Sequence, residues 1–167
     1  MSKKGYLTAA EYKILRQLLG FTQAQAAEFH CVQNIRTIQR WEKGDSWVSE
    51  LACDKITALA EKINWAIDQA LKQAQQFKPN ELEITLIIYP DSCYKKFAHG
   101  FENLPNSVHQ AMIARTYTAL KELRYNAGIV EFNPQDYFAY MGATGQTDNQ
   151  STRAAWACDY HDRLILN

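Results

Sequence analysis

The segment from Phe21 to Gly44, FTQAQAAEFHCVQNIRTIQRWEKG, constrains the fold of this chain more than any other. It predicts a helix, a tight turn and a second helix. Thr22 followed by Gln25 is the pattern of a capping box, and Phe21 with Ala26 would close a hydrophobic staple across it. The beginning of the first helix is therefore well defined by the sequence alone.

The second helix of this segment is expected to have two chemically different sides. A rotation of about 100° per residue places Ile35, Ile38 and Trp41 on one side. That side should pack, together with Phe29 of the preceding helix. The opposite side is basic and rich in amides, and it carries Gln33, Arg36, Arg40 and Lys43, flanked by Thr37 and Gln39.

The polar side suits recognition of DNA. Arg and Gln side chains have the donor geometry that reads guanine and adenine edges in a major groove, whereas Lys43 near the helix end suits phosphate. The unit as a whole predicts a DNA-reading helix-turn-helix. The alternative is an ordinary surface helix with a solvated polar face.

Several residues of this unit also occur in a specific order. They are Thr22, Gln23, Ala27, Ile38, Arg40, Trp41, Glu42 and Gly44. In this order they resemble the Cro/repressor-type (XRE-like) helix-turn-helix family. The resemblance implies a lambda-repressor-like bundle, in which Gln23 contacts DNA phosphate, the stretch from Gln33 to Arg40 faces the bases and Trp41 is structural.

Between Ala27 and Ile38 the chain has one residue more than is common in that family, and we place it around 33–35. The order in which residues would enter the groove is therefore open. The expected DNA-binding set is Gln23, Gln33, Asn34, Arg36, Thr37, Gln39, Arg40 and Lys43.

Two more helices are predicted around this unit. Upstream, Thr8 and Glu11 form a second capping box before an apolar stripe of Ile14, Leu15, Leu18 and Leu19 that stops at Gly20. Downstream, residues 49–77 lack Gly and Pro and predict one helix of about 29 residues, or roughly 43 Å.

This long helix carries an apolar seam at three- and four-residue steps. A second protein chain could cover the part that extends beyond the first three helices, or the chain's own C-terminal half could. The sequence does not decide between the two. The seam consists of Leu51, Ile56, Leu59, Ile63, Ile67, Ala70, Leu71 and Ala74.

The C-terminal half predicts a small α+β module. Residues 81–89 alternate apolar and polar positions and predict a strand, and 129–132 predict a second short strand beside it. Asp91 or Ser92 would cap a short helix to 97, a longer helix would run over 108–126 and close at Gly128, and Asn133 with Pro134 would begin a last helix. The stretch 142–153 is polar and aperiodic and is expected to be a loop, with Trp156 and Ile165 docking on the module or on a partner subunit.

The predicted fold class is therefore mainly α, with short strands in a small α+β C-terminal module. The expected divisions are a DNA-binding domain with its extended helix over 1–77, an accessory or dimerisation module over 78–141, and a loop and tail over 142–167. This order of parts resembles the YdiL-like family, which includes repressors associated with anti-CRISPR operons. That resemblance implies a homodimeric repressor that binds an inverted-repeat operator in double-stranded DNA.

Composition agrees with site-specific rather than indiscriminate binding. The 167 residues have a formal net charge of zero, yet residues 1–44 contain seven Lys/Arg against three Asp/Glu, whereas the remainder contains eleven against fifteen. The basic surplus thus lies where DNA would bind. No apolar run has transmembrane length, and the charged start MSKKGYLTAAEYK does not resemble a signal peptide, so we expect a cytoplasmic protein that does not enter membranes.

No catalytic residue, metal site or cofactor is predicted. The cysteines at 31, 53, 93 and 158 show no C-x-x-C pairing and are expected to remain thiols. His30 beside Cys31, and Cys158 three residues before His161, lack the paired spacing of a zinc site. The chain also has no nucleophile motif and no phosphate-binding glycine loop.

Three other functions stay open. In a protein-interaction module, such as the antitoxin of a toxin–antitoxin pair, the C-terminal half would bind a partner protein. An RNA-binding regulator could stack bases on Tyr94, Tyr125 or Tyr137, beside Lys95, Lys96 or Arg124, if those rings were exposed. An enzyme would require a deep pocket lined by perturbed ionisable groups.

Overall fold

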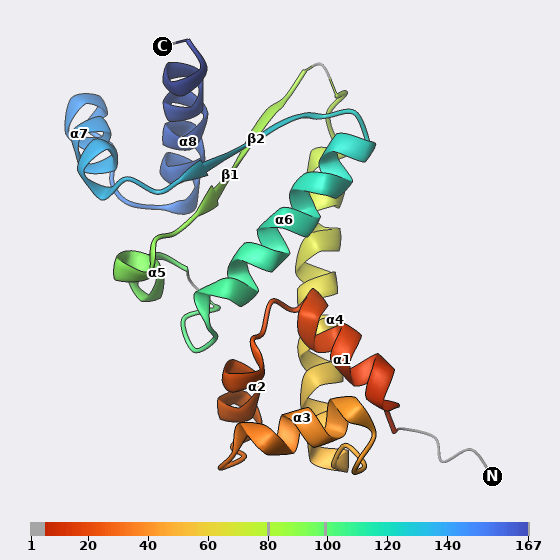
Figure 1. Cartoon of the computed structure of the whole chain (residues 1–167). Helices are drawn as coiled ribbons and strands as arrows, with labels where there is room; N and C mark the ends of the chain where they lie inside the picture. The colour runs from red at the N-terminus through yellow and green to blue at the C-terminus, as the bar shows by residue number, and fades with distance from the viewer. Residues whose placement is uncertain (1–5, 80, 99, 167) are drawn as a thin grey trace. The chain divides into compact units, whose positions relative to one another are not determined.

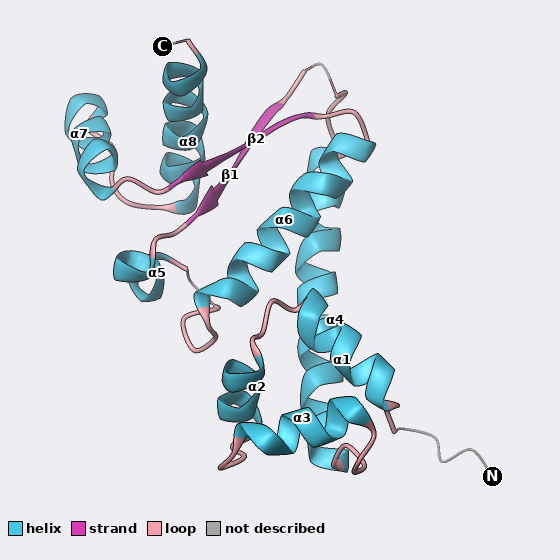
Figure 2. Cartoon of the chain, in the orientation of Figure 1, coloured by secondary structure: helices cyan, strands magenta, loops and turns pink. Residues whose placement is uncertain are grey.

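The computed structural model describes residues 6–79, 81–98 and 100–166. These residues are mainly helical, and two parallel strands lie in the C-terminal half (Figures 1 and 2). The chain divides into two compact units, of which the first comprises residues up to Asp68 together with Asn103–Met112, and the second comprises Gln69–Glu102 and Ile113–Asn167. The division falls within the long helix rather than at 77. None of the described helices is long and apolar enough to cross a membrane.

The first unit begins with three short helices, α1 (Ala9–Leu18), α2 (Gln23–His30) and α3 (Ile35–Lys43). Both predicted capping boxes are present, because Thr8 and Thr22 each accept the N3 backbone N–H while the N3 side chain binds back to the cap. Local sequence therefore determines where α1 and α2 begin.

The buried face of α1 differs from the predicted stripe. Ile14 and Leu18 are 54% and 51% exposed, whereas Tyr12, Arg16 and Leu19 are buried. These three residues also follow a helical spacing, and the ion pair between Arg16 and Glu42 allows a charged side chain to occupy the interior. The stripe prediction was wrong for Ile14 and Leu18 because hydrophobicity alone does not reveal a buried ion pair.

The connection between α1 and α2 passes very close to the first turn of α6 (Asn106–Glu122). Gly20 has a φ of +78°, and a Cβ there would lie 2.4 Å from the Ser107 carbonyl oxygen. Only glycine fits both the backbone conformation and the space. In the same region, the Ser107 hydroxyl donates to Gln25 Oε1 at 3.2 Å.

The long helix α4 (Glu50–Ala74) confirms the predicted helix and ends three residues earlier than expected. Its seam is covered by the chain itself, because Ile56, Leu59, Ile63, Ile67 and Ala74 are buried in a single copy. Ala70 and Leu71 are half-buried, and Leu51 is exposed. Of the two alternatives for the seam, burial within the chain is the correct one.

In the second unit, β1 (Glu83–Ile88) pairs in parallel with β2 (Asn126–Glu131), in a register that runs from Glu83 opposite Asn126 to Ile88 opposite Glu131. Ile84 and Leu86 lie in one apolar cluster with Leu120 and Tyr125, as period two requires. Ile87 packs on a second cluster on the other side of the strand. Both predicted strands are thereby confirmed.

The crossover from β1 to β2 contains two helices, α5 (Asp91–Phe97) and α6. Pro90, rather than Asp91 or Ser92, is the N-cap of α5 and makes no side-chain hydrogen bond. The helix α6 ends at Glu122 instead of near Asn126, because Arg124 adopts a left-handed conformation with φ +66°. Gly128, expected to end this helix, lies inside β2.

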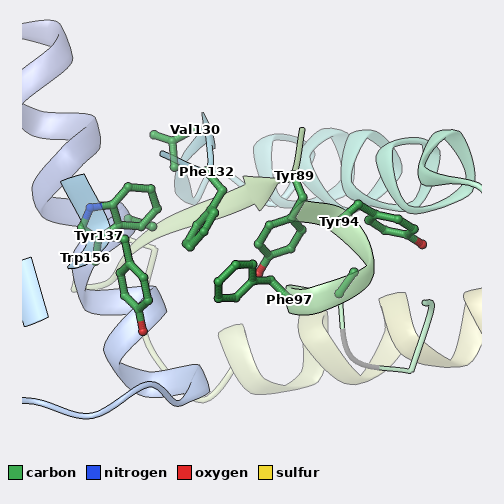
Figure 3. Packing of buried hydrophobic residues seen from close by; sticks show 9 residues of the cluster. Tyr89, Tyr94, Phe97, Val130, Phe132, Tyr137 and Trp156 are labelled. Atoms are coloured by element: carbon green, nitrogen blue, oxygen red, sulfur yellow. The ribbon is translucent and has the colours of Figure 1, made fainter. Parts of the chain in front are cut away.

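The second unit is held together by an aromatic cluster, which Figure 3 shows from close by. Phe132 lies near its centre, with its ring centroid 4.6 Å from Phe97 and 5.2 Å from both Tyr137 and Trp156. The Phe132 and Trp156 rings meet edge to face and the other two pairs are tilted, and aromatic pairs at such distances stabilise a core beyond the area they bury. The buried members are Tyr89, Tyr94, Phe97, Ala98, Val130, Phe132, Tyr137, Trp156 and Ala157.

The expected loop over 142–153 is confirmed only for residues 145–149, because both of its ends are helical. The helix α7 (Pro134–Thr144), capped by Asn133 as predicted, includes Gly142, and a further helix, α8, spans Gln150–Ile165. Asn149 caps α8 by accepting the Thr152 N–H at 2.9 Å. Trp156 is buried in the chain's own module, where its indole N–H donates to Asp136 at 2.8 Å, and α8 packs against both strands (Figure 1). The sequence concealed this helix because its first turn continues the polar, aperiodic stretch, and its apolar residues from Ala154 to Cys158 follow one another without a helical period.

Candidate nucleic-acid interface

The connection between α2 and α3 is fixed by its own backbone. Cys31 ends α2 in a left-handed conformation with φ +57°, and its N–H donates to the carbonyls of Ala27 and Glu28. Asn34 begins α3, because its Oδ1 accepts the backbone N–H of Arg36 at 2.9 Å. Four residues therefore separate the two helices, and Gln33 lies on the turn rather than on the helical face to which its spacing assigned it.

The inner side of α3 packs through Ile38 and Trp41, both buried as predicted. The Trp41 ring lies 5.5 Å from Tyr12 of α1 and 5.9 Å from His30 of α2, in edge-to-face arrangements that join the three helices. Ile35 was wrongly assigned to this side. It is 38% exposed, because as the first residue of α3 it lies at the edge of the packed face.

His30 occupies the buried position that the sequence analysis assigned to Phe29, which is only half-buried. Neither ring nitrogen of His30 has a hydrogen-bond partner among the described residues. Burial first, and the positive charge of Lys55 second, lower the pKa of His30 to about 4. At neutral pH the ring is therefore uncharged and packs as an aromatic residue.

A polar network runs beneath the exposed side of α3. The Arg16 guanidinium pairs with the Glu42 carboxylate and also donates to the Phe21 carbonyl. Glu42 Oε2 accepts the Gln23 side-chain amide at 2.8 Å, and Gln39 Nε2 in turn donates to Gln23 Oε1 at 3.4 Å. Two predicted DNA-binding residues, Gln23 and Gln39, are thus brought together and held by a buried ion pair.

Arg16 is not among the site residues predicted from the sequence, and Glu42 is predicted only through the family resemblance. A signal for Arg16 was present. Arg16 follows Tyr12 by four residues and precedes Leu19 by three, so it lies on the inward face of the helix. An acidic partner from elsewhere in the chain is needed to offset the cost of burying its charge.

The outer side of α3 presents three cations. Arg36, Arg40 and Lys43 recur at four- and three-residue steps, so they form one stripe along the helix, and all three are exposed. Within residues 6–79, 81–98 and 100–166, none of them forms an ion pair. Gln33 and Asn34 are exposed at the N-terminal end of this stripe, whereas Thr37 is half-buried at its side.

The three tyrosines on which an RNA-binding regulator could stack bases are not exposed. Tyr94, Tyr125 and Tyr137 are all buried, and their hydroxyls bond within the chain, for example Tyr125 to the Phe77 carbonyl at 3.0 Å. Their burial removes the observation on which an RNA-binding regulator depended. The four cysteines are free thiols, of which Cys31 is exposed.

No protein-family model matches this chain, and no curated protein matches its sequence. The geometry and chemistry of the α2–α3 surface are therefore the basis on which a function is inferred.

Proposed function

We propose that the protein is a site-specific DNA-binding transcriptional regulator, a homodimeric repressor that inserts α3 into the major groove. The main support is the basic outer side of α3. The stripe of Arg36, Arg40 and Lys43 is exposed and without acidic partners, while the opposite side of the same helix is packed through Ile38 and Trp41. A rigid helix that presents unpaired guanidinium groups to solvent suits a polyanion with readable base edges.

The roles of the side chains follow from their positions. Arg36 and Arg40 can donate two parallel hydrogen bonds to guanine O6 and N7, whereas Lys43 in the last turn suits a phosphate. Gln33 and the amide nitrogen of Asn34 are at the N-terminal end of α3, the end from which recognition helices contact base edges. Binding requires no chemistry, so the protein would act by occupying its site.

The network beneath the helix would control the angle between α2 and α3. Gln23 bridges Glu42 and Gln39, and thus joins the start of α2 to the middle of α3. A side chain held in this way loses less conformational entropy when it meets DNA. Gln23 would contact phosphate from this position, and Gln39 and Thr37 would line the edge of the groove.

A symmetric dimer would place two such helices on half-sites about 34 Å apart, which is one turn of DNA. The formal net charge of the chain is zero, so non-specific attraction would be weak and the affinity would depend on a few contacts. Binding would weaken as salt increases, in proportion to the number of phosphates neutralised.

The test is selection of bound duplexes from a random DNA library, performed with the native protein and with the Arg36→Ala/Arg40→Ala variant. An enriched palindrome with the native protein alone is the expected result. Each single replacement should then cost about 1–3 kcal/mol of binding free energy and relax preference at one base position. Lys43→Ala should weaken all sequences equally, and the matched control Lys72→Ala, an exposed cation on α4, should change nothing.

The second candidate is a protein-interaction module such as an antitoxin. It is favoured by the apolar end of α8, where Ile165 is 66% exposed next to the exposed Leu164 and Leu166. If folded native protein enriches no DNA sequence, this surface becomes the candidate binding site for a partner protein, and the assignment of α3 as a reading helix fails.

A further inference from the structure

Three side chains with metal-binding atoms meet where β1 begins and α8 approaches its end. They are Glu83 on β1 and the neighbouring pair His161 and Asp162 on α8, and one ligand atom from each lies within 4.8 Å of the other two. All three belong to the second compact unit. They are distant from the α2–α3 surface in sequence and take no part in the proposed DNA contacts.

The spacing between two of these atoms does not fit a hydrogen bond. His161 Nδ1 lies 3.7 Å from Glu83 Oε1, beyond the usual limit of about 3.2 Å for an N–H···O bond. Two ligands bound to one metal ion at about 2.0–2.2 Å with tetrahedral geometry lie about 3.4 Å apart. The separation of the nitrogen and the oxygen is close to that value.

His161 Nδ1 is also a buried polar atom that has no hydrogen-bond partner among the described residues. An imidazole nitrogen without a partner in such a position is unfavourable, because it has lost its contact with water. A metal ion between Nδ1 and the Glu83 carboxylate would satisfy both groups.

The ring of His161 is oriented by a glycine on the neighbouring strand. A Cβ at Gly128 would lie 2.5 Å from His161 Nε2, so the ring packs directly on the β2 backbone where any other residue would block it. One edge of the imidazole is therefore held against β2, and Nδ1 is directed to Glu83 on β1. Orientation of a ligand imidazole by its surroundings is a usual property of metal sites.

Among the described residues, no lysine or arginine neutralises the two carboxylates of the cluster. Neither Glu83 nor Asp162 forms an ion pair with a lysine or arginine of the described chain. Arg163, the nearest cation in sequence, binds Asp136 at 2.7 Å and Asp159 at 2.9 Å instead. The cluster thus combines two carboxylates without a lysine or arginine partner and one imidazole nitrogen without a hydrogen-bond partner among the described residues.

We propose that Glu83, His161 and Asp162 form a binding site for a divalent transition metal of the Zn²⁺ type. The donor set is one imidazole nitrogen and two carboxylate oxygens, which suits Zn²⁺, whereas Ca²⁺ and Mg²⁺ prefer oxygen ligands alone. Three protein ligands leave one position for water. Because the ligands come from β1 and α8, the bound ion links the beginning of the sheet to the C-terminal helix and stabilises the second unit.

The test is calorimetric titration of Zn²⁺ into the full chain with its cysteines kept reduced. The expected result is binding of a single equivalent and a higher thermal unfolding midpoint with Zn²⁺ than with Ca²⁺. His161→Gln, Glu83→Gln and Asp162→Asn should each weaken binding at least about tenfold, since even partners outside the ligand shell contribute 10- to 100-fold. Asp159→Asn is the matched control, because it removes a carboxylate from the same helix outside the cluster, and it should retain full affinity.

A second measurement does not depend on any variant being folded. In the native protein, the ¹⁵N resonances of the His161 imidazole should shift on addition of Zn²⁺, most strongly at Nδ1, while those of His30 and His109 stay unchanged. Absence of Zn²⁺ binding at millimolar concentration would overturn the proposal. So would binding that persists in the His161→Gln and Asp162→Asn variants, or binding that is abolished by Cys31→Ser, since either would locate the ion elsewhere.

Discussion

Acid should destabilise the first unit through His30, whose ring is buried between Tyr12, Phe29 and Trp41. Both of its nitrogens lack partners, and burial lowers its pKa to about 4, with Lys55 adding to the effect. In the unfolded chain a histidine has a pKa of about 6.5. The folded state therefore binds fewer protons at this ring than the unfolded state between these two values.

Because the unfolded state binds more protons, lowering the pH lowers the free energy of unfolding. Stability that depends on the neutral ring is fully present above pH 6.5 and is lost as the pH falls toward 4. A difference of about 2.5 pKa units, at about 1.4 kcal/mol for each unit, sets a maximum loss of about 3 kcal/mol, of which about 2 kcal/mol is already lost at pH 5. That is a large fraction of the 5–15 kcal/mol that is typical of a domain.

The assay is urea unfolding of the native protein and of the His30→Leu variant at a series of pH values from 7.5 to about 4.5, followed by circular dichroism. Leucine is close in size and has no group to protonate, so the variant should be at least as stable as the native protein at pH 7. The native protein should then lose about 2 kcal/mol more than the variant between pH 7 and pH 5. His109, whose pKa burial also lowers to about 4, is present in both proteins and cancels.

One result would contradict the predicted role of His30. If both proteins lose stability in parallel over this range, His30 is protonated equally well in the folded state, and its ring is not excluded from water as described. A variant that is much less stable at pH 7 would show instead that a nitrogen of His30 has a partner.

Two further predictions concern single groups. Tyr12→Phe removes a buried hydroxyl that has no hydrogen-bond partner among the described residues, so we expect unchanged stability or a gain of up to about 1 kcal/mol in urea unfolding, and a clear loss would reveal a partner. Gly128→Ala should destabilise the second unit by about 1–3 kcal/mol, since the added Cβ would meet the His161 ring at 2.5 Å. An unchanged unfolding midpoint would mean that the ring can move away freely.

The sequence predicted correctly those features that depend on neighbours within a few residues. The capping boxes at Thr8 and Thr22, the cap at Asn133 and the alternation in β1 each result from contacts over two to four positions. The exposure of Arg36, Arg40 and Lys43 follows in the same way, from helical period and polarity. Such signals need no knowledge of the rest of the chain.

The errors occurred where distant residues change what a local pattern means. Arg16 is buried because Glu42 neutralises it from 26 positions away, and Ile14 and Leu18 are exposed in consequence. Gly128 lies in a strand rather than at a helix end, because His161 occupies the space that a side chain would fill. The helix α8 begins inside a stretch that is polar and aperiodic, and it is stabilised because Trp156 and Ala157 pack into an aromatic cluster formed by other elements.

The candidate sites also differ in whether neighbouring or distant residues form them. The basic stripe of α3 lies on one helix, so the sequence by itself determined which side chains it presents. The network from Arg16 through Glu42 to Gln23, and the cluster of Glu83 with His161 and Asp162, join residues far apart in the chain. Only the tertiary structure decided these, because the energy of burying a charge or an unpaired nitrogen depends on what the fold places beside it, and local sequence does not contain that partner.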